Sequence, residues 1–172
     1  MLYLCCGKLA CGKSRWAEAF VKENPAVILS VDGLTIPLSD LLQGPVHDRV
    51  TAAVKEYLLS AAEQILRTGA DVILDWGFWR RDERTQVRAR FEGLGFPVCL
   101  VYFPMTPSRW QANIGDRNRR IAGGSYAAYP VDEGLMKKCE ALFQEPGEDE
   151  TDRVVVPAEP EAVPDPASCE EA

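Results

Sequence analysis

The sequence has 172 residues, the usual size of one domain, and 47% of them are hydrophobic. No segment approaches the run of about 18–20 apolar residues that a membrane helix requires, and the N-terminus lacks the features of a signal peptide, so we expect a cytoplasmic protein without a membrane partner. The net charge is −7, but residues 144–172 hold ten acidic residues and one arginine, which leaves +2 for the rest. This nearly neutral body suits a small anionic ligand better than a nucleic acid duplex.

The predicted elements alternate between short apolar runs and longer helical patterns. In chain order they are a strand at 2–6, a helix at 14–22, a strand at 26–30, a helix at 46–68, a strand at 71–75, a helix at 81–94, a strand at 97–103, helices at 107–118 and 131–143, and a short strand at 154–156. Such alternation predicts an α/β domain with a parallel sheet over residues 1–156. Residues 157–172 are rich in Pro, Glu and Ala, which predicts a disordered acidic tail.

The cysteines show neither a metal-binding nor a disulfide pattern. There are six, none of them in a C-x-x-C pair, and His47 is the only histidine. Cys5, Cys6 and Cys99 lie within predicted strands, where buried, reduced thiols are expected.

A glycine-rich segment follows the first predicted strand and matches the pattern G-x-x-x-x-G-K-S/T. In such a phosphate loop the backbone N–H groups surround the phosphates, the lysine reaches the terminal phosphates and the final hydroxyl coordinates Mg²⁺. The helix that follows adds the positive end of its dipole. The segment consists of Gly7, Lys8, Leu9, Ala10, Cys11, Gly12, Lys13 and Ser14. We therefore predict that the protein binds ATP and Mg²⁺; the Asn-Lys-x-Asp signature of GTPases is absent.

Two aspartates stand at the ends of predicted strands. Asp32 follows the strand at 26–30 and is a candidate base for an acceptor hydroxyl, although an Asp-Gly pair also favours a simple turn there. Asp75 ends the strand at 71–75 and is a candidate for the magnesium shell or for substrate contact. Trp76 and Phe78 follow it and are candidates for an aromatic wall beside an organic acceptor, with core packing as the alternative.

Two groups of arginines are candidates for anion contact. Arg117, Arg119 and Arg120 follow the fourth strand, where a helical lid would place them over the phosphates. In the second group, Arg81 and Arg84 are candidates for acceptor binding.

Together, the phosphate loop, the S-x-D segment ending at Asp32, the I-L-D-W-G-F segment at 73–78 and the R-x-x-R pair at 117–120 resemble the small AAA-type P-loop kinases. That group includes the polynucleotide kinase domain, chloramphenicol phosphotransferase and the zeta-toxin kinases. The resemblance covers residues 1–156. It implies a three-layer P-loop NTPase fold with a five-stranded parallel sheet of order 2-3-1-4-5 and an Arg-containing helical lid.

The resemblance also implies roles for single residues. Asp32 would be the general base, Ser14 would bind magnesium, and Lys13 with Arg117 and Arg120 would surround the γ-phosphate. Residues 143–146 are similar to the region that lies beside the adenine in such kinases.

These observations predict an enzyme that transfers the γ-phosphate of ATP to a hydroxyl of a small-molecule acceptor. A first alternative is a 5′-hydroxyl polynucleotide kinase, which would need a positive channel formed by Arg80, Arg81, Arg84 and the lid. A second alternative, of another class, is a nucleotide-binding switch or interaction module without an acceptor.

Overall fold

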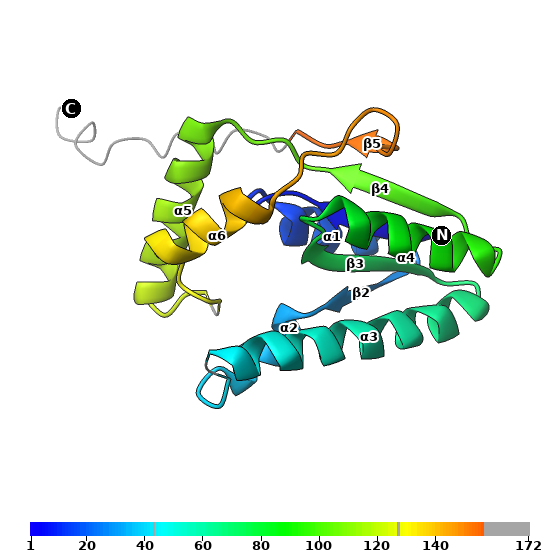
Figure 1. The fold of residues 1–172 in the computed structure, drawn as a ribbon, viewed down its shortest axis with the longest axis horizontal. Coiled ribbons are helices and arrows are strands. Elements are labelled where there is room, and N and C mark those ends of the chain that lie inside the picture. Colours follow the sequence, from blue (N-terminus) through cyan, green and yellow to red (C-terminus); the bar gives the residue numbers. More distant parts are fainter. Residues whose placement is uncertain (43, 127, 157–172) are drawn as a thin grey trace, which may run out of the picture.

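The computed structural model describes residues 1–42, 44–126 and 128–156. Five parallel strands form one sheet: β1 (Leu2–Cys6), β2 (Ala26–Ser30), β3 (Asp71–Gly77), β4 (Val98–Tyr102) and β5 (Arg153–Val154). Their order is β2-β3-β1-β4-β5, which confirms the predicted order 2-3-1-4-5 (Figure 1).

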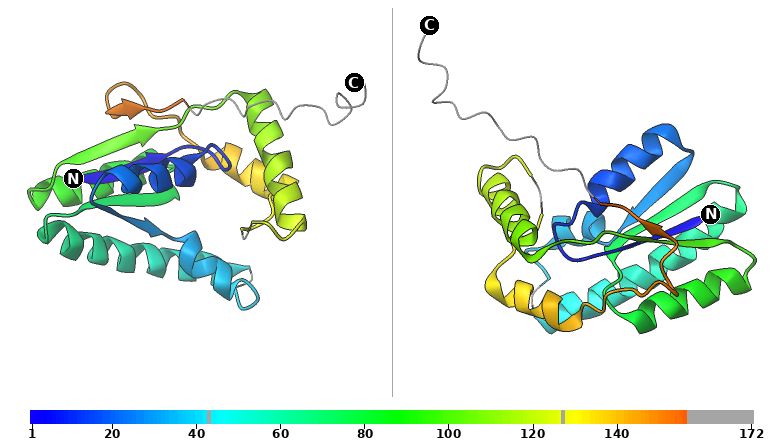
Figure 2. Two further views of the ribbon diagram at one scale, coloured as in Figure 1. Left: turned by 180° about the vertical axis from the view of Figure 1, so that it is seen from behind. Right: turned by 90° about the horizontal axis from the view of Figure 1, so that it is seen from above.

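Helices cover both faces of the sheet, so the three-layer architecture is also confirmed (Figures 1 and 2). On one face α1 (Lys13–Glu23) packs Ala17 against Cys5 and Ile73 of the strands. On the other face α3 (Pro45–Arg67) and α4 (Arg81–Gly93) bury apolar side chains against β1, β3 and β4. Buried strand residues on both faces explain why the strands read as continuous apolar runs rather than as alternating ones.

The remaining helices lie beyond the carboxyl ends of the strands. They are α5 (Pro107–Ala122) and α6 (Glu133–Leu142), which share a small core of Trp110, Ile114, Val131 and Cys139 (Figure 1). The short helix α2 (Asp32–Thr35) and the 3-10 helix η1 (Ile36–Leu38) connect β2 to α3. No helix in residues 1–42, 44–126 and 128–156 combines the length and the apolar composition needed to cross a bilayer.

Four predicted boundaries need correction. Helix α5 continues to Ala122 instead of ending at residue 118, so Arg119 and Arg120 lie on its last turn. Strand β3 continues through Trp76 to Gly77, and β5 is shorter than predicted. Asp32 does not end β2 but begins α2, because Val31 and the residues after it already have helical dihedral angles. The predicted tail at 157–172 lies outside the described residues.

A buried ion pair connects α4 to the loop before β5. The Arg84 side chain is 2% exposed, and its Nη2 and Nε atoms donate to the Glu150 carboxylate at 2.7 and 2.9 Å. Its Nη1 atom donates to the carbonyl oxygens of Phe78 at 3.0 Å and Gln144 at 2.9 Å. Arg84 therefore joins the turn after β3 to the loop before β5.

The sequence-based expectation that Arg81 and Arg84 contact an acceptor is therefore corrected. The Arg84 guanidinium is occupied by Glu150 and by backbone carbonyls, and Arg81 pairs with Asp149 on the outer surface. Arg88 completes the arrangement with a hydrogen bond to Asp152. These arginines dock an acidic loop of the same chain.

We predict that Arg84→Met lowers the free energy of unfolding by about 3–5 kcal/mol, because it leaves a largely buried carboxylate without its partner. Urea denaturation of the two proteins at neutral pH measures this difference. Arg81→Met is the matched control, since its pair with Asp149 is more than half exposed and should contribute no more than about 1 kcal/mol. Equal losses in the two variants would contradict the role given to Arg84.

The ion pair also predicts a pH dependence. The hydrogen bonds from Arg84 hold the pKa of the Glu150 carboxyl below its ordinary value. The contribution of this group to stability is therefore complete above the unfolded-state pKa and is lost as the pH falls through the lowered folded-state pKa. In Arg84→Met, the free energy of unfolding should therefore decrease less as the pH is lowered through this range.

Candidate active site

The phosphate loop joins β1 to α1 by a turn that only glycine permits at its first position. A Cβ atom on Gly7 would lie 2.7 Å from the Cys11 sulfur and 3.1 Å from the Phe103 carbonyl oxygen. Further along, Ala10 (φ 56°) and Gly12 (φ 93°) adopt left-handed backbone conformations. Successive N–H groups of such a turn, followed by a helix N-terminus, form a concave site for an anion.

Lys13 is the first residue of α1 and folds back over this loop. Its Nζ atom donates to the carbonyl oxygens of Lys8 at 2.7 Å and Gly7 at 3.2 Å and lies 3.4 Å from the Cys11 sulfur. Ser14 follows on the first helical turn and is exposed. The loop thus presents one ammonium group and one accessible hydroxyl, the donor and the metal ligand that a nucleoside triphosphate with Mg²⁺ requires.

Three side chains from distant elements hold the loop carbonyls. The Trp79 indole donates to Gly7 O at 3.2 Å, the Trp110 indole to Leu9 O at 2.9 Å, and Asn113 Nδ2 to Ala10 O at 2.9 Å. The sequence assigned none of these three residues to the phosphate loop. Tryptophan and asparagine in a helix or turn give no signal of a partner some 70 to 100 positions away.

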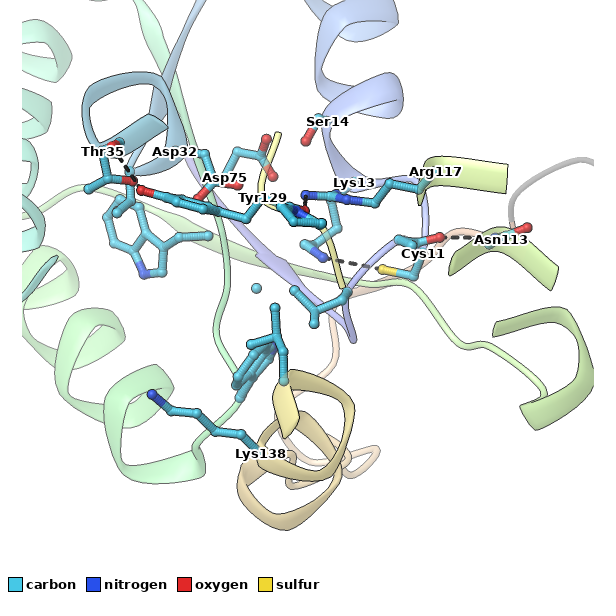
Figure 3. A pocket seen from close by; sticks show the side chains of 18 of the residues that line it. Cys11, Lys13, Ser14, Asp32, Thr35, Asp75, Asn113, Arg117, Tyr129 and Lys138 are labelled. Atoms are coloured by element: carbon cyan, nitrogen blue, oxygen red, sulfur yellow. Dashed lines mark hydrogen bonds between the residues drawn. The ribbon is translucent and has the colours of Figure 1, made fainter. Parts of the chain in front are cut away.

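A single cavity of about 1320 Å³ extends from the phosphate loop to α3, α5 and α6. Figure 3 shows Lys13, Asp32, Asp75 and Arg117 gathered around the same part of it. The cavity wall contains these four residues together with Ser14, Trp76 and Arg120. The structure therefore brings together most of the candidates that are scattered along the sequence.

Phe78, like Arg81 and Arg84, is a candidate that the structure places outside the cavity wall. Its side chain is fully buried in the core, where it stacks on Trp76 with ring centroids 5.0 Å apart. Trp76 itself reaches the cavity. An aromatic wall beside the acceptor therefore stays a prediction for Trp76, whereas Phe78 is a core residue.

The two carboxylates lie at the same edge of the sheet but in different environments, since Asp75 is within β3 and Asp32 begins the helix that follows β2. Asp75 is 7% exposed and lies opposite Ser30 in the β2–β3 register. Asp32 faces the open cavity from α2 and remains accessible. Its concave surroundings raise the pKa of Asp32 by desolvation, and the nearby Asp75 carboxylate raises it further, while Arg117 acts in the opposite direction. A carboxyl group with a raised pKa is a stronger proton acceptor once it is ionised.

The predicted lid arginines lie on one helix beside the loop. Arg117, Arg119 and Arg120 belong to the last turns of α5 and line the cavity. The Arg117 and Arg120 guanidinium groups lie 5.6 and 4.9 Å from the centroid of the Tyr126 ring. The structure thus supplies a cationic helix end at the expected place, while its movement as a lid stays a prediction.

The segment between α5 and α6 reaches across the cavity to α2 and α3. The Tyr129 hydroxyl donates to the Thr35 carbonyl oxygen at 2.8 Å (Figure 3). The Tyr129 ring meets the His47 ring edge-on, with centroids 5.6 Å apart. From α6, Lys138 pairs with Asp48 at 3.3 Å. These contacts, which sequence reasoning did not find, place Tyr129 over the side of the cavity that holds Asp32.

Residues 2–146 match the family model described as AAA domain. The chain belongs to this AAA-domain family. A comparison with curated proteins gave no match.

Solved structures of P-loop kinase-like proteins share the fold. A sugar kinase from Janibacter sp. HTCC2649 has 14% identity and a TM-score of 0.64, over 90% of this chain and 84% of that one. Kti12 from Chaetomium thermophilum, solved in complex with ADP-AlF3, has 16% identity and a TM-score of 0.64, over 92% of this chain and 89% of that one. A chain of the Pnkp1/Rnl/Hen1 RNA repair complex has 15% identity and a TM-score of 0.62, over 82% of this chain and 43% of that one. At these identities the likeness establishes the fold, and the family implies nucleotide binding.

Proposed function

We propose that this protein is a kinase that transfers the γ-phosphate of ATP to a hydroxyl group of a small-molecule acceptor. The observation that carries the proposal is that the phosphate loop, with Lys13, and the Asp32 carboxylate face one cavity at the carboxyl edge of the sheet. The loop follows β1, Asp32 follows β2, and β3 with Asp75 lies between these two strands. A phosphoryl donor held by the loop would present its terminal phosphate toward a carboxylate that can accept a proton. The AAA-domain family and its kinase-like structural neighbours support the same conclusion.

The ATP phosphates would lie on the loop formed by residues 7–14. Lys13 would leave the Gly7 and Lys8 carbonyls and turn to the β- and γ-phosphates, since a phosphate is a stronger partner for an ammonium group than a peptide carbonyl. The adenine would lie beside residues 143–146. Gln144 N, which donates to Trp79 O at 2.8 Å, fixes that segment next to the tryptophan that holds the loop.

Ser14 and Asp75 fit a magnesium site by their chemistry, one as an accessible hydroxyl and the other as a carboxylate at the end of the neighbouring strand. When bound there, Mg²⁺ would neutralise charge on the phosphate oxygens.

The transfer itself requires few protein groups. The acceptor oxygen forms a bond to the γ-phosphorus, the bond from that phosphorus to the β–γ bridging oxygen breaks, and its electron pair leaves with ADP. Asp32 accepts the hydroxyl proton. Arg117 and Arg120 offset the negative charge on the transferring oxygens, which is the electrostatic contribution that such reactions depend on most.

The geometry favours a small acceptor over a polynucleotide. A polynucleotide site would need the positive channel predicted from Arg80, Arg81, Arg84 and the lid. Arg81 and Arg84 instead pair with acidic residues of the loop before β5, and Arg80 pairs with Asp82. On the side of the cavity that holds Asp32, the Tyr129 hydroxyl donates a hydrogen bond to the Thr35 carbonyl oxygen, and this contact narrows the access of a large acceptor to Asp32.

Incubation with γ-labelled ATP and fractionated small metabolites tests the proposal directly. A kinase deposits the label in an organic product. Release of the label only as inorganic phosphate with every fraction would support the switch or interaction module instead.

We predict that Lys13→Ala abolishes transfer and reduces the rise in melting temperature that Mg-ATP produces, because this ammonium is the one side-chain charge of the loop that reaches the terminal phosphates. Thermal shift with and without Mg-ATP gives both readings for each variant. Lys22→Ala, at the exposed end of the same helix, is the control and should behave like the wild type. Full activity in Lys13→Ala would contradict the assignment of residues 7–14 as the phosphate-binding loop.

We predict that Asp32→Asn lowers turnover by about 10²–10⁴-fold while ATP affinity and melting temperature stay close to wild type, because the amide keeps the shape and removes the base. Asp40→Asn, an exposed aspartate outside the cavity wall, is the control. Asp75→Asn should instead weaken the dependence on magnesium. Loss of ATP binding together with stability in Asp32→Asn would show a structural role.

The raised pKa of Asp32 adds a pH test to this variant. A general base acts only when ionised, so wild-type turnover should fall as the pH drops through that raised pKa. The residual turnover of Asp32→Asn should lack this acid-side decline.

A further inference from the structure

The far part of the cavity, away from the phosphate loop, has a wall of its own. We call it the acceptor end. It is formed by α3 and by the segment from the end of β3 into α4, and its residues are His47, Asp48, Thr51, Lys55, Trp76, Arg80 and Glu83.

Polar side chains recur along α3 at this wall. His47, Thr51 and Lys55 are spaced four residues apart, which puts them on one face of the helix. A helix buries apolar residues on the face that meets the core, and α3 does so with Leu58, Ala62 and Leu66 further along. A polar face toward a cavity therefore indicates that the cavity takes a polar ligand.

The cations around the acceptor end are already neutralised. Lys55 Nζ lies 2.6 Å from Glu83 Oε1, and the Trp76 indole donates to the same oxygen at 3.2 Å. The Lys55 and Glu83 side chains are only 29% and 25% exposed, so solvent screens this pair incompletely. Arg80 pairs with Asp82 at 2.8 Å, and Lys138 pairs with Asp48 at 3.3 Å.

Asp32 belongs to the cavity wall outside the acceptor end. Arg117 and Lys13 act electrostatically on its carboxylate, and in the proposed reaction both are engaged by the ATP phosphates. An acceptor with an anionic group would therefore meet only lysine and arginine side chains that already have a partner: Lys55 and Arg80 are paired with carboxylates, and Arg117 would contact ATP. Unlike a neutral ligand, it would lose hydration without gaining a counter-charge.

We propose that the acceptor is a small, hydroxyl-rich molecule without an anionic group, such as a neutral sugar, a polyol or an amino sugar. The paired Lys55 and Glu83 offer a donor and an acceptor side by side, an arrangement that matches neighbouring hydroxyl groups. Trp76 adds an apolar surface for the carbon skeleton. This inference rests on the proposed kinase function and names its substrate class.

Label transfer from γ-labelled ATP to defined mixtures tests the inference. One mixture holds aldoses, hexitols and inositol, a second holds amino sugars, a third holds aldonates, uronates and sugar phosphates, and a fourth holds a 5′-hydroxyl oligonucleotide. We expect transfer in the first or second mixture at least about tenfold faster than in the third and fourth. The first two mixtures separate neutral from amino acceptors.

The alternative outcomes are distinct. Faster transfer to the third or fourth mixture would overturn the inference and leave the kinase function standing. Transfer to none of the mixtures, with label released only as phosphate, would overturn both.

A change in specificity tests the role of the ion pair. Glu83→Gln leaves the Lys55 ammonium without its counter-charge, so the rate constant kcat/KM for aldonates relative to that for aldoses should rise about tenfold. The double variant Lys55→Gln with Glu83→Gln should return the ratio to the wild-type value, which a merely structural role of Glu83 would not predict. The control is Glu56→Gln. Glu56 belongs to α3, is ion-paired like Glu83, is 71% exposed and lies outside the cavity wall, so this variant should leave the ratio of the two kcat/KM values unchanged. An unchanged ratio in Glu83→Gln would overturn the inference.

Discussion

The close approach at Gly7 is the constraint on which the rest of the structure depends. The Gly7 N–H donates to Gly77 O at 2.9 Å, and the Gly7 carbonyl accepts from both Trp79 and Lys13. Gly77 itself has a φ of 90° and lies so near Trp79 that a Cβ atom would be 2.8 Å from the indole nitrogen. Two glycines on neighbouring strands thus let the ends of β1 and β3 meet, which places the phosphate loop beside Asp75 and close to Asp32.

The same turn connects the site to the loop before β5. Arg84 bonds to the Phe78 carbonyl and to Glu150, so the position of the turn depends on an ion pair outside the cavity. Two groups of arginines can therefore be distinguished by their location. The arginines of α4 hold the chain together, whereas those at the end of α5 face the cavity.

Most of the fold could be predicted because its signals are local and periodic. Apolar runs gave the strands, the glycine-lysine-serine pattern gave the loop between β1 and α1, and the resemblance gave the strand order. The same signals predicted that Lys13, Asp32 and Asp75 lie at one edge of the sheet, because the carboxyl ends of parallel strands all lie at the same edge.

The remainder depends on contacts that no local pattern contains. Arginine is rarely buried, and the partner of Arg84 is 66 residues away, so its ion pair could not be predicted from helix α4 alone. Tyr129 lies between two helices, where no periodicity indicates its bond to Thr35. The acidic composition of residues 144–156 likewise gave no sign that Asp149, Glu150 and Asp152 pair with the arginines of α4.

Diffraction from crystals grown with Mg²⁺ and a non-hydrolysable ATP analogue would locate the γ-phosphate relative to Lys13 and Asp32. We expect Lys13 Nζ to leave the Lys8 carbonyl for the β- and γ-phosphates, and the γ-phosphate to face the Asp32 carboxylate across the acceptor position. Phosphates bound away from residues 7–14, or a γ-phosphate turned from Asp32 toward solvent, would contradict this expectation.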